Sequence, residues 1–502
     1  MPETSTPDTA EAADTVGGDR HQLYIGGTWV DPHSTAIVEV FSPATGARVG
    51  SAPDADATDV DAAVRAARAS FDSGVWSSVP PAERADVLDR AAALIEERSA
   101  EIISLVSAEM GAPPAAIATL QQLPGTGVLR AYAQAARDYA WVEYRDGLFG
   151  TTRITREPVG VVGAITAWNV PLFLICNKFG AALAAGCSIV LKPAPETPLT
   201  GNYLAELFAE AGVPDGVISV VPGGADTGKA LVEHPGVDKI TFTGSTAAGK
   251  AIGAACAHSL KRCSLELGGK SAAIVLDDVD IAANGYMITF LGLFNTGQAC
   301  VAQTRILVPR SRHDEIVEAM VAAARTMTVG LPDDPSAQLG PVISERQRQR
   351  IEGYIEAGKA AGATAVLDGG RPDGLDGGYF LTPTIFTGVT NDMAIAQEEI
   401  FGPVLSVIAY DDVDEAIAIA NDSDYGLAGT VWTADVERGI AISEKIRTGT
   451  FGINFYAIDP GSPFGGFKNS GIGRECGPEG LEAFLEHKST MLPAGYQVSQ
   501  DS

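Results

Sequence analysis

The chain has 502 residues, of which 46% are apolar and 20% charged, a composition typical of a soluble globular protein with more than one packed unit. Its 35 basic and 63 acidic side chains give a net charge of −28 at pH 7, and so acidic a surface repels nucleic acid and anionic membranes. Neither nucleic acid nor a membrane is therefore an expected partner.

Residues 1–20 are predicted to be a disordered tail, because they are acidic and rich in Thr, Ala and Pro. They lack the basic start and the apolar stretch of a signal peptide, and no later window offers the roughly 18 unbroken apolar residues of a membrane span. The six cysteines form no CxxC pair, which predicts a reducing, cytoplasmic setting. The six scattered histidines form no metal-binding motif, so no metal is expected.

The order of elements predicts an α/β fold. Apolar residues three and four apart predict helices at 57–71 and 81–111. From residue 158 buried strands and helices alternate with short connections, which is typical of a doubly wound parallel sheet, and a second alternating stretch runs from 271 to about 470. Between them, the Thr-, Tyr- and Arg-rich segment 138–157 is predicted to form paired strands that belong to neither unit.

Two segments nearly match a phosphate-binding loop, GGADTGKA at 223–230 and GSTAAGKA at 244–251. Both place alanine where a nucleotide triphosphatase needs Ser or Thr to hold magnesium, so that class is disfavoured. A strand followed by small residues and a helix start still presents free backbone N–H groups to an anion, with Ser245 or Thr246 as the N-cap. An ordinary capped helix is the alternative. No G-x-G-x-x-G motif is found.

Three polar side chains stand where an apolar element ends. Cys300 follows the polar turn Asn-Thr-Gly-Gln-Ala and is either a nucleophile or a small buried hydrophobe. Glu266 ends an apolar strand, where burial would raise its pKa and make it a general base, unless it faces solvent. Asn169 is either an oxyanion donor or a turn former. Glu399 and Phe401 lie in a loop that is either a surface turn or a ribose clamp.

Seven motifs, in this order, resemble those of the NAD(P)-dependent aldehyde dehydrogenases: TAWNVP, KPAPETP, FTGST, ELGGK, FNTGQAC, EEIFGP and PFGGFKNSG. The resemblance runs from about residue 22 to about 492. It implies an aldehyde dehydrogenase-like α/β fold, with two doubly wound domains and a small β oligomerisation element that makes a homodimer or homotetramer. The implied division is a dinucleotide-binding domain at 21–137 and 158–266, a catalytic domain at 267–470, and the oligomerisation element with the C-terminal tail at 138–157 and 471–502.

The resemblance also implies a role for each matching residue. Cys300 falls on the nucleophile, Glu266 on the base, and Asn169 with the backbone N–H of Cys300 on the oxyanion hole. Lys192 matches the adenosine ribose contact, Gly244 and Ser245 the pyrophosphate site, and Glu399 and Phe401 the nicotinamide ribose site. The remaining positions implied for the cofactor are Ile165, Thr166, Trp168, Glu196, Gly223, Thr227, Phe242 and Leu267.

NAD is the cofactor that the resemblance implies. In KPAPETP the place of the glutamate found in many NAD-selective members is taken by Pro195, and Glu196 stands one residue later. A carboxylate in this region would repel the 2′-phosphate of NADP. Its displacement leaves NADP open as the alternative.

The expected substrate is an uncharged, largely apolar aldehyde, whether aliphatic, terpenoid or aromatic. None of the residues implied to line its entry tunnel is Arg or Lys, so an anionic aldehyde would have no partner. Asp459 leaves an amino- or betaine-type aldehyde as the alternative if it faces the tunnel, but not if it is a turn residue before Pro460. The implied lining residues are Val170, Phe173, Leu174, Asn177, Phe294, Ala299, Val301, Phe455, Tyr456 and Ile458.

Three other functions remain as alternatives. An enzyme that passes the acyl group to coenzyme A generally lacks the glutamate of ELGGK, which is present here as Glu266. A cysteine hydrolase would need a histidine to activate the thiol, and none of the six lies in a motif. A non-catalytic structural relative would have no reason to keep Cys300, Glu266 and Asn169 together.

Overall fold

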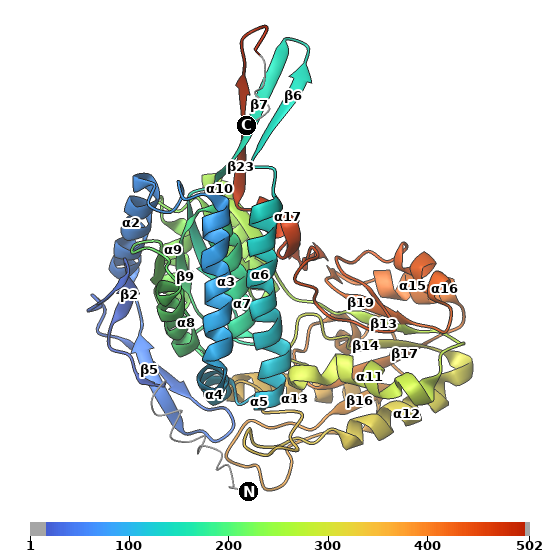
Figure 1. Cartoon of the computed structure of the whole chain (residues 1–502). Coiled ribbons are helices and arrows are strands. Elements are labelled where there is room, and N and C mark those ends of the chain that lie inside the picture. The colour runs from blue at the N-terminus through green and yellow to red at the C-terminus, as the bar shows by residue number, and fades with distance from the viewer. Residues whose placement is uncertain (1–16, 497–502) are drawn as a thin grey trace, which may run out of the picture.

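The computed structural model describes residues 17–496, which form two α/β bodies and a three-stranded sheet that projects away from them (Figure 1). Most of the predicted N-terminal tail lies outside the described residues. Its last part does not: β1 (Gly18–Asp19) pairs in parallel with β5 (Arg48–Pro53), and Arg20 forms an ion pair of 3.1 Å with Glu206. The prediction of disorder up to residue 20 was therefore wrong at its C-terminal end.

The first body is built on a sheet of eight strands, and it confirms the predicted doubly wound parallel arrangement. The five central strands run parallel, and the strands at both edges are antiparallel to their neighbours. In spatial order they are β22 (Gly471–Ile472), β12 (Arg262–Glu266), β11 (Lys239–Thr243), β8 (Val161–Ile165), β9 (Ser188–Lys192), β10 (Ile218–Val220), β2 (Leu23–Ile25) and β3 (Thr28–Val30).

Helices cover both faces of this sheet, which is why its central strands β8, β9 and β11 are buried along their whole length. The helix predicted at 81–111 is divided at Arg98, whose φ of −92° and ψ of 23° leave the helical range. One face carries α2 (Ala57–Ser73), α9 (Ala225–Glu233) and α10 (Thr246–Ser259), and the other carries α3 (Pro81–Glu97), α4 (Ser99–Met110), α6 (Leu123–Asp138), α7 (Pro171–Ala185) and α8 (Pro198–Glu210).

Within residues 17–496 no single helix is long and apolar enough to cross a membrane. The pair Ser99–Met110 and Pro114–Asp138 meets the length and composition criterion jointly, but it is bent by 113°.

The second body confirms the second predicted α/β unit. It is a seven-stranded sheet with the order β15 (Thr364–Leu367), β16 (Thr384–Thr387), β17 (Val404–Tyr410), β14 (Arg305–Pro309), β13 (Ala272–Val275), β19 (Gly429–Trp432) and β20 (Gly452–Ile453). Its helices are α11 (Ile281–Leu293), α12 (His313–Thr326), α13 (Glu345–Ala360), α15 (Val413–Asn421) and α16 (Val436–Ser443).

The strands predicted at 138–157 form the projecting sheet of Figure 1. β6 (Val142–Gly147) and β7 (Gly150–Pro158) pair as a hairpin, and β23 (Leu485–Met491) from the C-terminus pairs along the whole of β7. The segment before β23 does not join this sheet, although the expected division at residue 471 placed it there. β22 pairs with β12 in the first body, and α17 (Gly477–Glu482) packs on α6 and α7.

Candidate active site

The polar turn before Cys300 is a left-handed reversal of the chain. Directly after α11, Asn295, Thr296 and Gly297 have φ angles of 52°, 57° and 70°. A threonine in this conformation is strained, and its hydroxyl is held by a hydrogen bond of 2.9 Å to a backbone carbonyl of the neighbouring loop. The motif Asn-Thr-Gly therefore ends the helix sharply and places Cys300 at the edge of a large apolar core to which both bodies contribute.

Asn169, in the loop between β8 and α7, is tied to this turn from both ends. Its side-chain amide donates to the carbonyl of Gln298 at 3.0 Å, and its own carbonyl accepts from the side-chain amide of Asn295 at 3.0 Å. Asn169 is buried, with 5% of its surface exposed. Because a side-chain amide has two N–H donors, one of them is left for another acceptor near Cys300.

Glu266 is the last residue of β12, and its carboxylate is buried and has no hydrogen-bond partner among the described residues. Burial raises the pKa of Glu266 well above its ordinary value, the charge of Glu475 raises it further, and Lys178 and Arg474 act in the opposite direction. A carboxylate in this state is suited to accept a proton near neutral pH.

The two glycines of ELGGK let other groups pack closely against the backbone that follows Glu266. A Cβ atom on Gly269 would lie 2.2 Å from the carbonyl oxygen of Cys300, and one on Gly268 would lie 2.4 Å from a carboxylate oxygen of Glu399. Because the first contact is with backbone, only glycine fits at position 269, whereas at position 268 the Glu399 side chain would have to move. The motif thus brings the nucleophile candidate from the second body beside the base candidate of the first.

Burial also raises the pKa of the Cys300 thiol, and the charges of Glu266 and Glu399 raise it further. The backbone N–H groups of Cys300 and Val301 act in the opposite direction, since they stabilise the thiolate. The resting side chain is therefore a thiol, which must lose its proton before it can act as a nucleophile.

Sequence reasoning missed an ion pair behind Glu266. Lys178 Nζ donates to Glu475 at 2.7 Å and to Thr241 at 3.1 Å, and both charged side chains are buried. Asn177, which the sequence analysis placed in the substrate tunnel, donates to Glu475 at 2.6 Å and accepts from the Tyr132 hydroxyl at 3.0 Å. Asn177 thus belongs to a buried polar network, and its place along the tunnel stays a prediction. The sequence signal that could have revealed this network is the polar pair Asn177-Lys178 inside the otherwise apolar helix α7.

Several residues expected at the cofactor site meet at the carboxyl ends of β8, β9 and β11. Lys192 ends β9, and its ammonium donates to the carbonyls of Pro193 and Gly223 at 2.9 and 2.6 Å. Burial lowers the pKa of Lys192 to about 8, and the charge of Glu196 opposes this shift, so Glu196 lies near the ammonium. Thr227, which lies against Gly223, donates to a backbone carbonyl at 2.6 Å.

α10 begins in the same region. Ser245 is its N-cap and accepts from the N–H of Ala248 at 3.3 Å, which confirms one of the two expected caps. Gly244 precedes it, and the hydroxyl oxygens of Thr166 and Thr246 are buried and have no hydrogen-bond partner within residues 17–496. On the side of α10, Ile165, Phe242 and Leu267 are members of one apolar cluster.

The EEIFGP loop reaches this region from the second body. A Glu399 carboxylate oxygen accepts from the backbone N–H of Gly269 at 3.0 Å. Phe401, with a positive φ of 61°, packs edge-on against Trp168 with ring centroids 5.4 Å apart. The loop is therefore tied to ELGGK and to the Asn169 loop, and is not an isolated surface turn.

Known proteins share this sequence pattern and this arrangement of residues. The sequence pattern of the Aldehyde dehydrogenase family matches residues 29–490. The chain belongs to the aldehyde dehydrogenase family. It is accordingly an oxidoreductase acting on aldehydes.

Individual relatives agree with this assignment. The chain is 45% identical to a geranial dehydrogenase of Castellaniella defragrans, covering 94% of this chain and 99% of that protein. It is 44% identical to a 3-succinoylsemialdehyde-pyridine dehydrogenase of a Pseudomonas species, covering 96% and 100%. A Mycobacterium tuberculosis aldehyde dehydrogenase, solved as a complex with NAD+, superposes with a TM-score of 0.95 at 58% identity, covering 96% and 100%. The aldehyde dehydrogenase-like fold is thereby confirmed.

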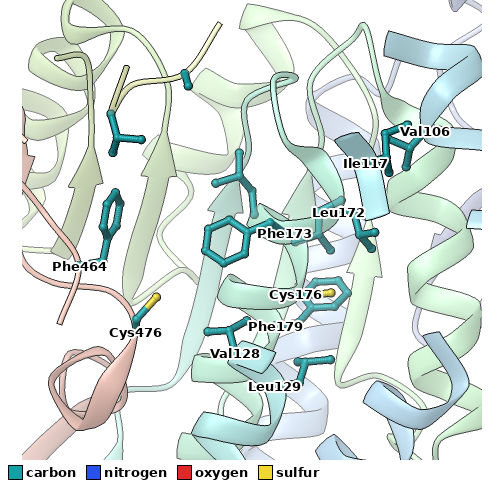
Figure 2. Close-up of a cluster of buried hydrophobic side chains, with 14 of the residues drawn as sticks. Val106, Ile117, Val128, Leu129, Leu172, Phe173, Cys176, Phe179, Phe464 and Cys476 are labelled. Carbon is teal, nitrogen blue, oxygen red and sulfur yellow. The ribbon is translucent and has the colours of Figure 1, made fainter. Parts of the chain in front are cut away.

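Most side chains expected along the aldehyde tunnel belong to, or pack against, the same apolar core that Cys300 contacts. Figure 2 shows Phe173 in this core, together with Phe464 from the C-terminal segment. Burial raises the pKa of Tyr456, and a thiolate at Cys300 would raise it further, so the two side chains are neighbours. Phe455 is 59% exposed and stands apart. The members or neighbours of the core are Val170, Phe173, Leu174, Phe294, Ala299, Val301, Tyr456 and Ile458.

Asp459 adopts the geometry of a turn residue. It is exposed, and its carboxylate accepts from the N–H of Gly461 at 3.0 Å and from the hydroxyl of Ser462 at 2.6 Å. Both oxygens are thus engaged by the turn that follows Pro460.

Two other cysteines belong to the packing of this region. Cys176 lies among apolar side chains of α6 and α7, as Figure 2 shows. Cys476 is fully buried beside Phe464, with its sulfur 3.8 Å from an oxygen of Asn177. Among residues 17–496, no three His, Cys, Asp or Glu side chains are placed to hold a metal ion.

Proposed function

We propose that the chain oxidises an uncharged, largely apolar aldehyde to its carboxylic acid with NAD+. The observation that carries this proposal is the meeting of Cys300, Asn169 and Glu266, which come from three separate segments of the chain, at one edge of the apolar core. Cys300 is the nucleophile, Asn169 the oxyanion donor and Glu266 the general base.

The residues beside α10 fit a dinucleotide. The first turn of this helix, capped by Ser245, presents backbone N–H groups to a pyrophosphate. The unpartnered hydroxyls of Thr166 and Thr246 and the ammonium of Lys192 are available to ribose or phosphate oxygens. Glu196 beside Lys192 favours NAD over NADP, because its carboxylate would repel a 2′-phosphate. Glu399 and Phe401 would hold the nicotinamide ribose.

The chemistry begins at the Cys300 sulfur. Once the thiol has lost its proton, the thiolate adds to the aldehyde carbon, and the carbonyl electron pair moves onto oxygen. The second N–H of the Asn169 amide and the backbone N–H of Cys300 stabilise that oxyanion. Bound NAD+ supplies the hydride acceptor, and the substrate is left as a thioester on Cys300. Glu266 then takes a proton from the water that attacks the thioester, and the acid departs as the Cys300 thiolate is restored.

The substrate class follows from the side chains around Cys300. Eight of the ten expected lining residues belong to or contact the apolar core, and none is cationic. Asp459 is occupied by its own turn, which disfavours the amino- and betaine-aldehyde alternative. Identity alone does not select a substrate, since relatives at 45% and 44% are named for different aldehydes. The apolar lining is the deciding feature.

Matched substrate pairs test this class. We expect kcat/KM to rise about fourfold for each methylene from propanal to hexanal, the equivalent of about 0.8 kcal/mol per buried CH₂. Betaine aldehyde should be a poorer substrate than its neutral isostere 3,3-dimethylbutanal, and succinic semialdehyde poorer than its methyl ester, each by on the order of a hundredfold. NADH absorbance measures all of them. Preference for the charged member of either pair would contradict the apolar assignment. In Asp459→Asn, the ratio of kcat/KM for betaine aldehyde to kcat/KM for 3,3-dimethylbutanal should be unchanged, because Asp459 only shapes its turn.

The same assay tests the alternative activities. An acylating enzyme would form NADH steadily only with coenzyme A, whereas Glu266 predicts full turnover without it. A cysteine hydrolase or a non-catalytic relative would form no NADH from an aldehyde.

We also propose a cytoplasmic homo-oligomer, a homodimer or homotetramer. The projecting sheet of β6, β7 and β23 exposes Leu148, Phe149 and Met491 by 91%, 87% and 81%. Apolar side chains and unpaired strand edges at such a tip are costly in water unless another subunit covers them. Light scattering should give a mass of at least twice the 52.0 kDa subunit at micromolar concentration. A monomer there would contradict the proposal.

A further inference from the structure

Two thiols outside the candidate active site face each other beneath α10. Cys256 lies in the last turn of α10 and is 1% exposed, and Cys263 is the second residue of β12 and is partly buried. The chain reverses between them at Leu260, with a φ of 56°, and the N–H of Lys261 donates to the carbonyl of Cys256 at 2.9 Å. This tight reversal folds β12 back along the helix.

The alternation of β12 points the second thiol at the first. Leu265 belongs to the apolar cluster between the sheet and α10, and so, two residues earlier on the same face, Cys263 packs against that cluster. Cys256 is a buried member of the same cluster. Glu266 faces the other side of the sheet, toward α7. The side chains of Cys256 and Cys263 are therefore neighbours, close enough for each to shift the pKa of the other.

The pairing makes the two thiols chemically unequal. The hydrogen bond from Cys256 lowers the pKa of Cys263, and the nearby ammonium of Lys239 lowers it further, against the effect of burial. The same contact and burial raise the pKa of Cys256. Cys263 is therefore more ionised at neutral pH than Cys300, whose pKa is raised, and reaction of a thiol with an oxidant depends on its thiolate.

We propose that Cys256 and Cys263 form a redox modification site that a peroxide closes to a disulfide. The Cys263 thiolate attacks one oxygen of hydrogen peroxide, which gives a sulfenic acid and releases hydroxide. The sulfur of Cys256 then attacks the sulfenic sulfur. A disulfide forms, and the sulfenic oxygen leaves as water with the Cys256 proton. Overall, two thiols and one peroxide give one disulfide and two waters.

The bond would join the end of α10 to the start of β12 without using any group of the proposed catalytic machinery. It would also protect Cys263, because a sulfenic acid captured by a neighbouring thiol does not proceed to the irreversible sulfinic acid. A thiol reductant restores both side chains. Peroxide is thus expected to reach Cys263 before it damages Cys300.

Peptide mapping tests the site directly, because trypsin cuts at Lys261 and Arg262 and so separates the two cysteines. Purified enzyme is treated with hydrogen peroxide, the remaining thiols are blocked, and the digest is analysed by mass spectrometry. We expect a disulfide-linked pair of peptides 251–261 and 263–270, which dithiothreitol separates again. The linked pair should form faster than Cys300 is oxidised, because the pKa of Cys263 is lowered and that of Cys300 is raised.

Two variants and a control make the result decisive. Cys256→Ala should leave Cys263 to advance to the sulfinic acid, and Cys263→Ala should leave Cys256 unmodified. Cys187→Ala is the matched control, since burial raises the pKa of that buried thiol to about 11 and its loss should not alter the linked pair. Sulfinic acid at Cys263 in the unmodified protein, or oxidation of Cys300 while both thiols stay reduced, would overturn the proposal.

Discussion

Replacing Cys300 with serine is expected to lower kcat for aldehyde oxidation by on the order of 10³-fold or more, because a neutral hydroxyl is a far weaker nucleophile than a thiolate. The substitution removes no bulk, so the fold should be retained. NADH formation at saturating NAD+ and aldehyde measures the effect, and a circular dichroism melt confirms folding.

A second cysteine substitution serves as the matched control. Cys176 is buried among the side chains of α6 and α7, and burial alone raises its pKa far above the range in which it could react (Figure 2). Cys176→Ala should therefore keep activity within a few-fold while it lowers stability slightly. Normal turnover in Cys300→Ser, or equal losses in both variants, would contradict the assignment of the nucleophile.

Glu266→Gln is expected to separate the two half-reactions. Hydride transfer needs Cys300 but not the base, so rapid mixing should give a burst of about one equivalent of NADH per active site, followed by turnover slowed on the order of a hundredfold or more. Loss of the burst itself would mean that Glu266 acts earlier, in removing the Cys300 proton.

The pH dependence of this step has a definite sign. Burial and Glu475 raise the pKa of Glu266, and only the ionised carboxylate accepts a proton, so thioester hydrolysis should rise with pH through that raised pKa. In Glu266→Gln this dependence should disappear. Glu475→Gln removes a neighbouring negative charge, lowers the pKa of Glu266, and should move the profile to lower pH. A shift to higher pH would contradict this electrostatic account.

The fold was largely predictable because its signals are local. Apolar strands and amphipathic helices alternate within short windows, and both sheets appear where that alternation was seen. The break at Arg98 was not visible, because the apolar rhythm continues through it while the backbone turns. The return of β22 to the first sheet depends on contacts with β12, some 200 residues earlier, and no local pattern reports such a pairing.

The candidate site was also predictable only in part from the sequence. Cys300, Glu266 and Asn169 each stand at the end of an element within a distinctive motif, and those motifs could be recognised in the sequence. Lys178 and Glu475 meet across 297 positions and carry no motif, so their influence on Glu266 became visible only in three dimensions. Asn177 was assigned to the tunnel from the resemblance alone, and the hydrogen bond of its side chain to Glu475 could not be predicted from the sequence.

The most direct test of the account is to look for the acyl group on Cys300. Glu266→Gln enzyme is mixed with NAD+ and hexanal, quenched in acid at the end of the burst, digested with trypsin and analysed by mass spectrometry. We predict that peptide 271–305, which contains Cys300 as its only cysteine, becomes heavier by one hexanoyl group in proportion to the NADH formed. The account would be contradicted if NADH appeared while this peptide stayed unmodified or the hexanoyl group were found on another peptide.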